Sequence, residues 1–143
     1  MADSVYGYKS GPRVPVQVKI DASTTAISVN DMLTLGTAGY MQKVAAGDNA
    51  LCVAMQACAV PSADGDITIL ADFSQASVYE FPPASGSTVQ GDASKAFDVG
   101  GAQSVDRAAS VDGEGGDGSL RCVAVDTVRN TMFVTIHPLI SGV

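Results

Sequence analysis

The stretch that decides the fold is Ser28-Val29-Asn30-Asp31-Met32-Leu33-Thr34-Leu35, a turn that leads into a short apolar strand. It runs on to the apolar segment Asn49–Ala54 and then to Asp66–Leu70, where apolar and polar residues alternate. Three later segments repeat this order, namely Thr88–Ala93, Gly118–Ala124 and Thr131–Ile136. Such a unit cannot bury its apolar face alone, so two copies packed together would form one core. The sequence therefore predicts two hairpin-rich quasi-repeats.

Residues 14–143 form the predicted domain, because strand-length apolar segments alternate there with turns rich in Gly, Asp, Asn and Pro. Val14, Val16, Val18 and Ile20 fall on one face of the first strand, and Pro15 confines that strand to an edge or a strand start. The other expected strands are Ala26–Ser28, Met32–Leu35, Tyr40–Val44, Leu51–Val60, Asp66–Leu70, Ser77–Phe81, Ala93–Phe97, Leu120–Asp126 and Thr131–His137. The predicted fold class is all-β, a small single-domain β-barrel or sandwich with an extended N-terminal arm.

Two segments of this domain need separate interpretation. Asn49–Val60 is rich in Ala and fits a three-turn helix, but we favour a buried strand because the matching Leu120–Val125 is short and β-branched. A turn, Pro61-Ser62-Ala63-Asp64-Gly65, also follows at once. Residues 98–118 are polar and rich in Gly, which predicts a mobile surface loop.

Residues 1–13 form the predicted arm, since they show no periodicity and contain mainly Gly, Tyr, Ser, Lys and Pro. Tyrosine provides a large contact area at low entropic cost, and basic residues can steer docking. We expect the arm to lie against a neighbouring chain, and its deletion to leave the domain folded. The alternative is that its tyrosines fold back on the domain. The predicted partner-binding residues are Tyr6, Tyr8, Lys9, Pro12 and Arg13.

Charge and cysteine usage limit the function classes. Only 16% of the 143 residues are charged and the net charge is −7, which argues against nucleic-acid binding. Residues 1–20 carry Lys9, Arg13 and Lys19 against Asp3, a balance of +2 that leaves −9 for the remainder. No apolar run approaches the length of a membrane span, and we expect no membrane partner. Three cysteines without a C-x-x-C pair indicate buried small hydrophobes in a reducing compartment, the cytosol, and are Cys52, Cys58 and Cys122.

Motifs for catalysis, metals and cofactors are not found in the sequence. The acidic residues Asp112, Glu114 and Asp117 lack the spacing of a calcium loop, so a solvated loop is favoured. His137, the single histidine, ends an apolar strand with no nucleophile motif in the chain, which indicates a structural role. Asp31 and Asp92 occupy matching places in the two repeats, and we interpret both as turn residues. The sequence predicts no catalytic residue, no metal site and no cofactor.

The pattern Ile27–Leu35, Gly39–Val44 and Asp48–Ala54, followed by the second turn Val89-Gln90-Gly91-Asp92, resembles the capsid decoration (cement) proteins of tailed bacteriophages. The resemblance covers roughly residues 14–136. It implies a non-enzymatic β-barrel made in the host cytoplasm and located on the outer surface of the virion. Its implied partners are the major capsid protein, whose neighbouring subunits it clamps, and copies of itself in a homotrimer. The Gly-rich stretch at 98–118 departs from the commonest pattern.

Two other function classes stay open. A ligand-binding β-module that recognises glycans or host surfaces would need exposed aromatic residues, yet the body lacks Trp and holds only Tyr40 and Tyr79. A small hydrolase would need a nucleophile placed beside His137, which a His137→Ala variant would test.

Overall fold

The structure, a computed structural model, describes residues 6–36, 39–111 and 118–138. These residues form two antiparallel sheets and no α-helix. The first sheet contains β2 (Pro15–Lys19), β3 (Met32–Leu35), β4 (Met41–Lys43), β5 (Cys52–Ala54) and β6 (Thr68–Asp72). The second contains β1 (Gly7–Ser10), β7 (Val78–Phe81), β8 (Ala96–Gly101), β9 (Ser104–Val111), β10 (Leu120–Asp126) and β11 (Thr131–Ile136). A 3-10 turn, η2 (Gln90–Asp92), precedes β8.

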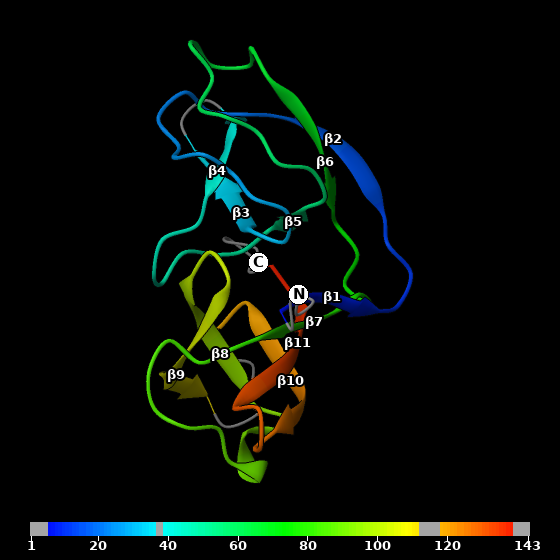
Figure 1. Cartoon of the computed structure of the whole chain (residues 1–143), viewed down its shortest axis with the longest axis vertical. Coiled ribbons are helices and arrows are strands. Elements are labelled where there is room, and N and C mark those ends of the chain that lie inside the picture. The colour runs from blue at the N-terminus through cyan, green and yellow to red at the C-terminus, as the bar shows by residue number, and fades with distance from the viewer. Residues whose placement is uncertain (1–5, 37–38, 112–117, 139–143) are drawn as a thin grey trace.

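The two sheets follow one another along the long axis of the molecule, with the five-stranded sheet at the top of Figure 1. The strand order is β2-β6-β5-β3-β4 in that sheet and β1-β7-β11-β10-β8-β9 in the other. The all-β prediction is thereby confirmed. Of the two predicted architectures, the arrangement is consistent with a small β-sandwich and not with a closed barrel.

The two sheets share one topology. Strands β2 to β6 and strands β7 to β11 each lie in the spatial order first, fifth, fourth, second, third. Every neighbouring pair within these two sets is antiparallel. In each set, a residue just after the first strand forms a parallel bridge to the third strand. These bridges are Ile20–Met41 and Pro83–Val105. The quasi-repeats predicted from the sequence are therefore two copies of one five-stranded unit, and β1 is an addition to the second.

The register of the strand pairs shows which residues are equivalent. Leu35 pairs with Met41 in the first unit, and Val99 pairs with Val105 in the second, 64 positions later. Val18 pairs with Ile69, and the equivalent pair Phe81 and Met132 lies 63 positions later.

These offsets revise the matching of Asp31 with Asp92. Asn30 donates its N–H to the carbonyl of Ala54, and the residue that makes the corresponding bond to Cys122 is Ser94. Asn30 and Ser94 also share a φ of 76°, which few non-glycine residues adopt. Asp31 thus corresponds in space to Lys95, although Asp31 and Asp92 both stabilise turns. Their carboxylates accept the N–H of the residue three positions earlier, at 2.8 and 3.1 Å.

Two apolar clusters replace the one core that we expected. The cluster of the first sheet contains Val18, Ile20, Ile27, Leu33, Met41, Cys52, Ala54, Ile69 and Ala71. The second sheet contributes most of the other cluster, which also takes residues from the first unit: Met32, Val44, Ala50, Val53, Tyr79, Phe81, Phe97, Val99, Val105, Leu120, Cys122, Met132, Val134 and Ile136. Backbone bonds cross between the units, from Met32 to Ala102 and from Gly47 to Val99, each 2.8 Å long. The units therefore pack through the second cluster.

Three local predictions have different outcomes. Residues 98–118 are not a loop throughout, because residues 96–101 and 104–111 pair as the hairpin β8–β9, and Val99 and Val105 bury their side chains. Within 49–60 the strand interpretation is confirmed for Cys52–Ala54, and no helix forms. Ala26–Ser28 is not a strand, although Ile27 makes an isolated bridge to Cys58.

Candidate interaction surface at the N-terminal segment

Residues 7–10 form an edge strand of the chain's own second sheet. Gly7 pairs with Glu80 and Tyr8 with Tyr79 along β7. Gly7 has a φ of 106°, and a Cβ on it would lie 2.2 Å from the Asn30 side chain, so the strand begins at a position that requires glycine. The prediction that the arm lies against a neighbouring chain and not against its own domain is wrong for these residues. Residues 1–5 lie outside the described part of the chain.

Tyr8 is held by two contacts of its ring and by a hydrogen bond of its hydroxyl. Its ring packs edge-on against Tyr79, with centroids 5.8 Å apart and planes at 69°. The guanidinium carbon of Arg13 lies 3.8 Å from the centroid of the Tyr8 ring, a cation–π contact. The Tyr8 hydroxyl donates to the Gly11 carbonyl at 2.5 Å. Sequence periodicity does not predict this packing, because a four-residue strand carries too few residues for a pattern.

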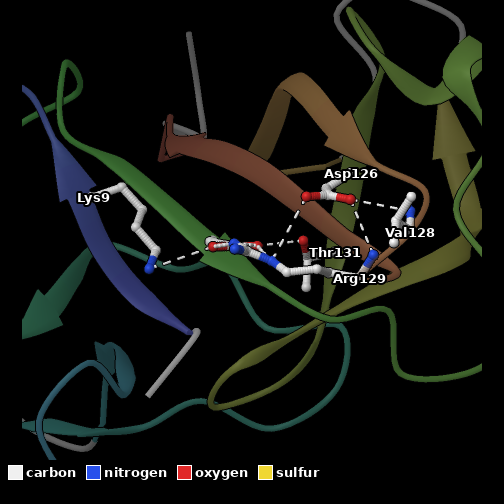
Figure 2. A network of polar contacts seen from close by, with 6 residues as sticks. Lys9, Asp126, Val128, Arg129 and Thr131 are labelled. Atoms are coloured by element: carbon white, nitrogen blue, oxygen red, sulfur yellow. Dashed lines mark hydrogen bonds and ion pairs between the residues drawn. The ribbon is translucent and has the colours of Figure 1, made fainter. Parts of the chain in front are cut away.

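The basic residue Lys9 contacts a carboxylate that has no exposure to solvent. Its Nζ lies 3.4 Å from Glu80, which also accepts hydrogen bonds from the guanidinium of Arg129 and the hydroxyl of Thr131. Figure 2 shows Lys9 approaching from one side and Arg129 and Thr131 from the other. Burial raises the pKa of Glu80, but the hydrogen bonds from Arg129 and Thr131 outweigh it, so the pKa lies below its ordinary value.

Arg13 contacts a second buried carboxylate, Asp72 at the end of β6. The Arg13 Nε lies 3.8 Å from Asp72, and the Tyr79 hydroxyl donates to Asp72 at 2.6 Å. The N–H groups of Val14 and Ser74 donate at 2.9 Å each. Burial raises the pKa of Asp72, yet these bonds lower it below its ordinary value overall. Burial and the bond to Asp72 raise the pKa of Tyr79.

Three of the five predicted partner-binding residues have the side-chain contacts described above. Tyr8, Lys9 and Arg13 make contacts within their own domain, which fixes the segment on β7. Tyr6 is 37% exposed and Pro12 is exposed, although the Pro12 carbonyl accepts a bond from the Ser77 hydroxyl at 3.0 Å. Binding of a partner by these residues remains a prediction.

The structure also presents an apolar surface that was not among the predicted sites. Val14 and Val16 continue the row of Val18 and Ile20 along β2, but they extend past the core and are 50% and 42% exposed. Pro15 indicated an edge strand in the sequence, and β2 does lie at the edge of its sheet. What periodicity could not show is where along the row the core ends.

The remaining candidates serve structural contacts. Asp31 pairs with Lys43 at 3.3 Å, and Asp92 pairs with Arg107 at 2.6 Å. The His137 Nε2 lies 2.9 Å from the Thr135 hydroxyl, and burial together with the charge of Arg121 lowers the pKa of His137. Asp112, Glu114 and Asp117 fall outside the described residues.

Two of the three cysteines are fully buried, as predicted. Burial raises the pKa of Cys52 to about 12 and that of Cys122 to about 11, so both thiols stay protonated at neutral pH. Cys58 is half-buried, and burial raises its pKa as well.

Within residues 6–36, 39–111 and 118–138, neither a pocket nor a group of three or more potential metal ligands is found. No helix in this part of the chain is long and apolar enough to cross a membrane. Comparisons with family models, with curated proteins and with solved structures give no match.

Proposed function

We propose that this chain is a structural protein that binds the outer surface of a tailed-bacteriophage capsid and clamps neighbouring major-capsid subunits. The observation that carries the proposal is the duplication of one five-stranded unit within the chain. A protein that ties two identical neighbours together benefits from two related surfaces, and the two units supply them. The resemblance of residues 14–136 to decoration proteins points to the same class.

The duplication also has an energetic consequence for such a clamp. Once one unit is bound, the second meets its site at a high effective concentration, so two weak contacts give a strong attachment. The units share backbone bonds and one apolar cluster, which holds them in a fixed relation. A rigid link loses little further entropy on binding. Assembly as homotrimers would multiply these contacts again.

The stabilisation of the shell would follow from mass action. A ligand that binds the assembled shell and not its dissociated subunits lowers the free energy of the shell by its binding free energy. Only 16% of the residues of the chain are charged, and a contact that contains few charges costs less to desolvate. The exposed side chains of Val14, Val16 and Tyr6 supply apolar area for it.

The test mixes the purified protein with expanded, undecorated capsids assembled from the major capsid protein of the phage that encodes this chain. Cryo-electron microscopy should show added density at regular positions between capsid subunits, grouped in threes. Decorated capsids should also resist heating to a higher temperature than bare capsids. Unexpanded precursor shells are the matched control, because a clamp fitted to the mature spacing of subunits should leave them undecorated. Bare expanded capsids at saturating protein would contradict the proposal.

A further inference from the structure

The outer edge of β2 differs from its equivalent in the second unit. In that unit the first strand, β7, is paired on both sides, with β11 on one and β1 on the other. In the first unit β2 pairs with β6, and no strand of the described residues covers its other edge. The edge that β1 covers in the second unit is therefore open in the first unit.

Hydrogen bonds at the two ends of β2 show which backbone groups face outward. The Val14 carbonyl accepts from the Phe73 N–H, and the Ile20 N–H donates to the Ile67 carbonyl, each at 3.0 Å. The N–H and C=O groups of the even-numbered residues therefore point toward β6. The N–H and C=O groups of successive residues point to opposite edges of a strand, so those of the odd-numbered residues point to the open edge. The Asp21 N–H, next in this series, donates to Met41 of β4 at 2.8 Å. The open segment is therefore 15–19, with N–H donors at Gln17 and Lys19.

The side chains of β2 match those that β1 covers on β7. Phe81 corresponds to Val18, so Tyr79 corresponds to Val16 and Ser77 to Val14. Tyr79 has no exposed surface, and Tyr8 of β1 packs against it. Val16 occupies the same place in the first unit and is 42% exposed. An apolar side chain on an added strand, in the place that Tyr8 holds, would bury Val14 and Val16.

Charge distinguishes the strand that this edge accepts from β1 itself. On β7 the buried Glu80 pairs with Lys9 of β1. The corresponding residue on β2 is Gln17, and two positions later the exposed Lys19 forms no ion pair with another described residue. A strand with a lysine opposite Lys19 would meet it with like charge. An acidic strand would pair with it.

We propose that the open edge of β2 binds an extended segment of a partner protein by strand addition, and that this segment carries an apolar residue facing Val16 and a carboxylate facing Lys19. This rests on the proposed function in one respect: the partner is then an exposed acidic strand of the major capsid subunit. Main-chain bonds to Gln17 and Lys19 supply affinity, and the two side-chain contacts supply specificity. Pro15 at the start of the edge limits pairing with unselected strands, since it offers no N–H.

The test uses Gln17→Pro, which removes the outward N–H and leaves the bonds to β6, with Gln17→Ala as the control that keeps the N–H. On undecorated capsids Gln17→Ala should bind like the parent protein. Gln17→Pro should bind about tenfold more weakly, the effect of losing one main-chain bond at a buried contact. Equal binding of all three proteins would overturn strand addition at β2 while the capsid function stands.

If the Gln17→Pro protein fails to fold, a second measurement on the parent protein still tests the proposal. Amide hydrogen exchange on the parent protein should show the Gln17 and Lys19 amides exchanging rapidly in solution and slowly on capsids. Unchanged exchange in fully decorated capsids would overturn the proposal. A dimer in solution that protects these two amides would also overturn it, because the occupant would then be a second copy.

A third experiment separates this inference from the proposed function if the parent protein does not bind capsids. The ¹⁵N-labelled chain is titrated with an eight-residue peptide of alternating Glu and Val, and with a Lys and Val peptide as control. The acidic peptide should shift the Gln17 and Lys19 amide resonances, and the basic peptide should leave them in place. If neither peptide, or both equally, shifts them, the edge has no affinity for an acidic strand and the proposal fails.

Discussion

Arg129, in the turn between β10 and β11, donates hydrogen bonds to both carboxylate oxygens of Glu80, a residue of β7 with no exposed surface. Asp126 holds the same turn, accepting the N–H groups of Val128 and Arg129 at 3.0 Å each. Figure 2 shows this turn beside the strand that carries Thr131. The turn therefore supplies the charge that a buried glutamate needs, and Lys9 of β1 adds a second.

Thr131→Val should destabilise the domain by about 1–3 kcal/mol, because it removes one donor to the buried Glu80 without changing the side-chain volume much. Urea denaturation monitored by circular dichroism measures the change. Thr127→Val, at an exposed position of the same turn, is the control and should change stability by less than about 0.5 kcal/mol. Similar effects for the two variants would show that the hydroxyl bond contributes nothing.

The domain should lose stability in acid through Asp72 and Glu80. Both have a pKa below the ordinary value when folded, so their stabilisation is present above the unfolded pKa of about 4 and is lost as pH falls through the folded values. The destabilisation caused by Glu80→Gln should therefore be large at pH 7 and smaller at pH 3. Urea titrations at pH 7, 5 and 3 measure it. Asp66→Asn, at an exposed position, is the control. A Glu80→Gln effect that does not change with pH would contradict this account.

Ser94→Gly should stabilise the domain by about 0.5–1 kcal/mol, since Ser94 is exposed and holds a φ of 76° that glycine adopts without strain. The equivalent Asn30→Gly should give no such gain, because the Asn30 carboxamide oxygen accepts the Tyr8 N–H at 3.3 Å. Thermal denaturation compares the two. Ser87→Gly, exposed and without positive φ, should lower the melting temperature slightly. A destabilised Ser94→Gly protein would refute the assigned strain.

Tyr8→Ala should cost about 2 kcal/mol of stability, because it removes the ring that contacts both Tyr79 and Arg13. Tyr6→Ala should have a smaller effect, as Tyr6 is 37% exposed. Deleting residues 1–12 should lower the melting temperature, which reverses the expectation drawn from the sequence. Chemical denaturation of the three proteins measures the free energies of unfolding, and thermal denaturation measures the melting temperatures. If the truncated protein is as stable as the full chain, β1 contributes no net free energy to its sheet.

The sequence by itself determined most of the strands and the duplication, but it did not predict β1 or β9. Leu120–Asp126 was predicted with the bounds that the structure shows, and Pro15 indicated the edge position of β2. Short-range physics suffices here, because alternation and turn chemistry act over a few residues. The residue equivalence of the repeats was wrong by three positions at Asp92, since turns of different length can precede the same strand, and register depends on strand pairing.

Only the tertiary structure decided the role of the N-terminal segment. Lys9 and Arg13 looked like free charges for a partner, because their carboxylate partners lie 71 and 59 positions away, at Glu80 and Asp72. Nothing local to the basic residues indicates that these two acids are buried, and burial is what binds the segment to its own domain. The open edge of β2 likewise became visible only beside the covered edge of β7, because strand neighbours are set by long-range packing and not by the residues of the strand itself.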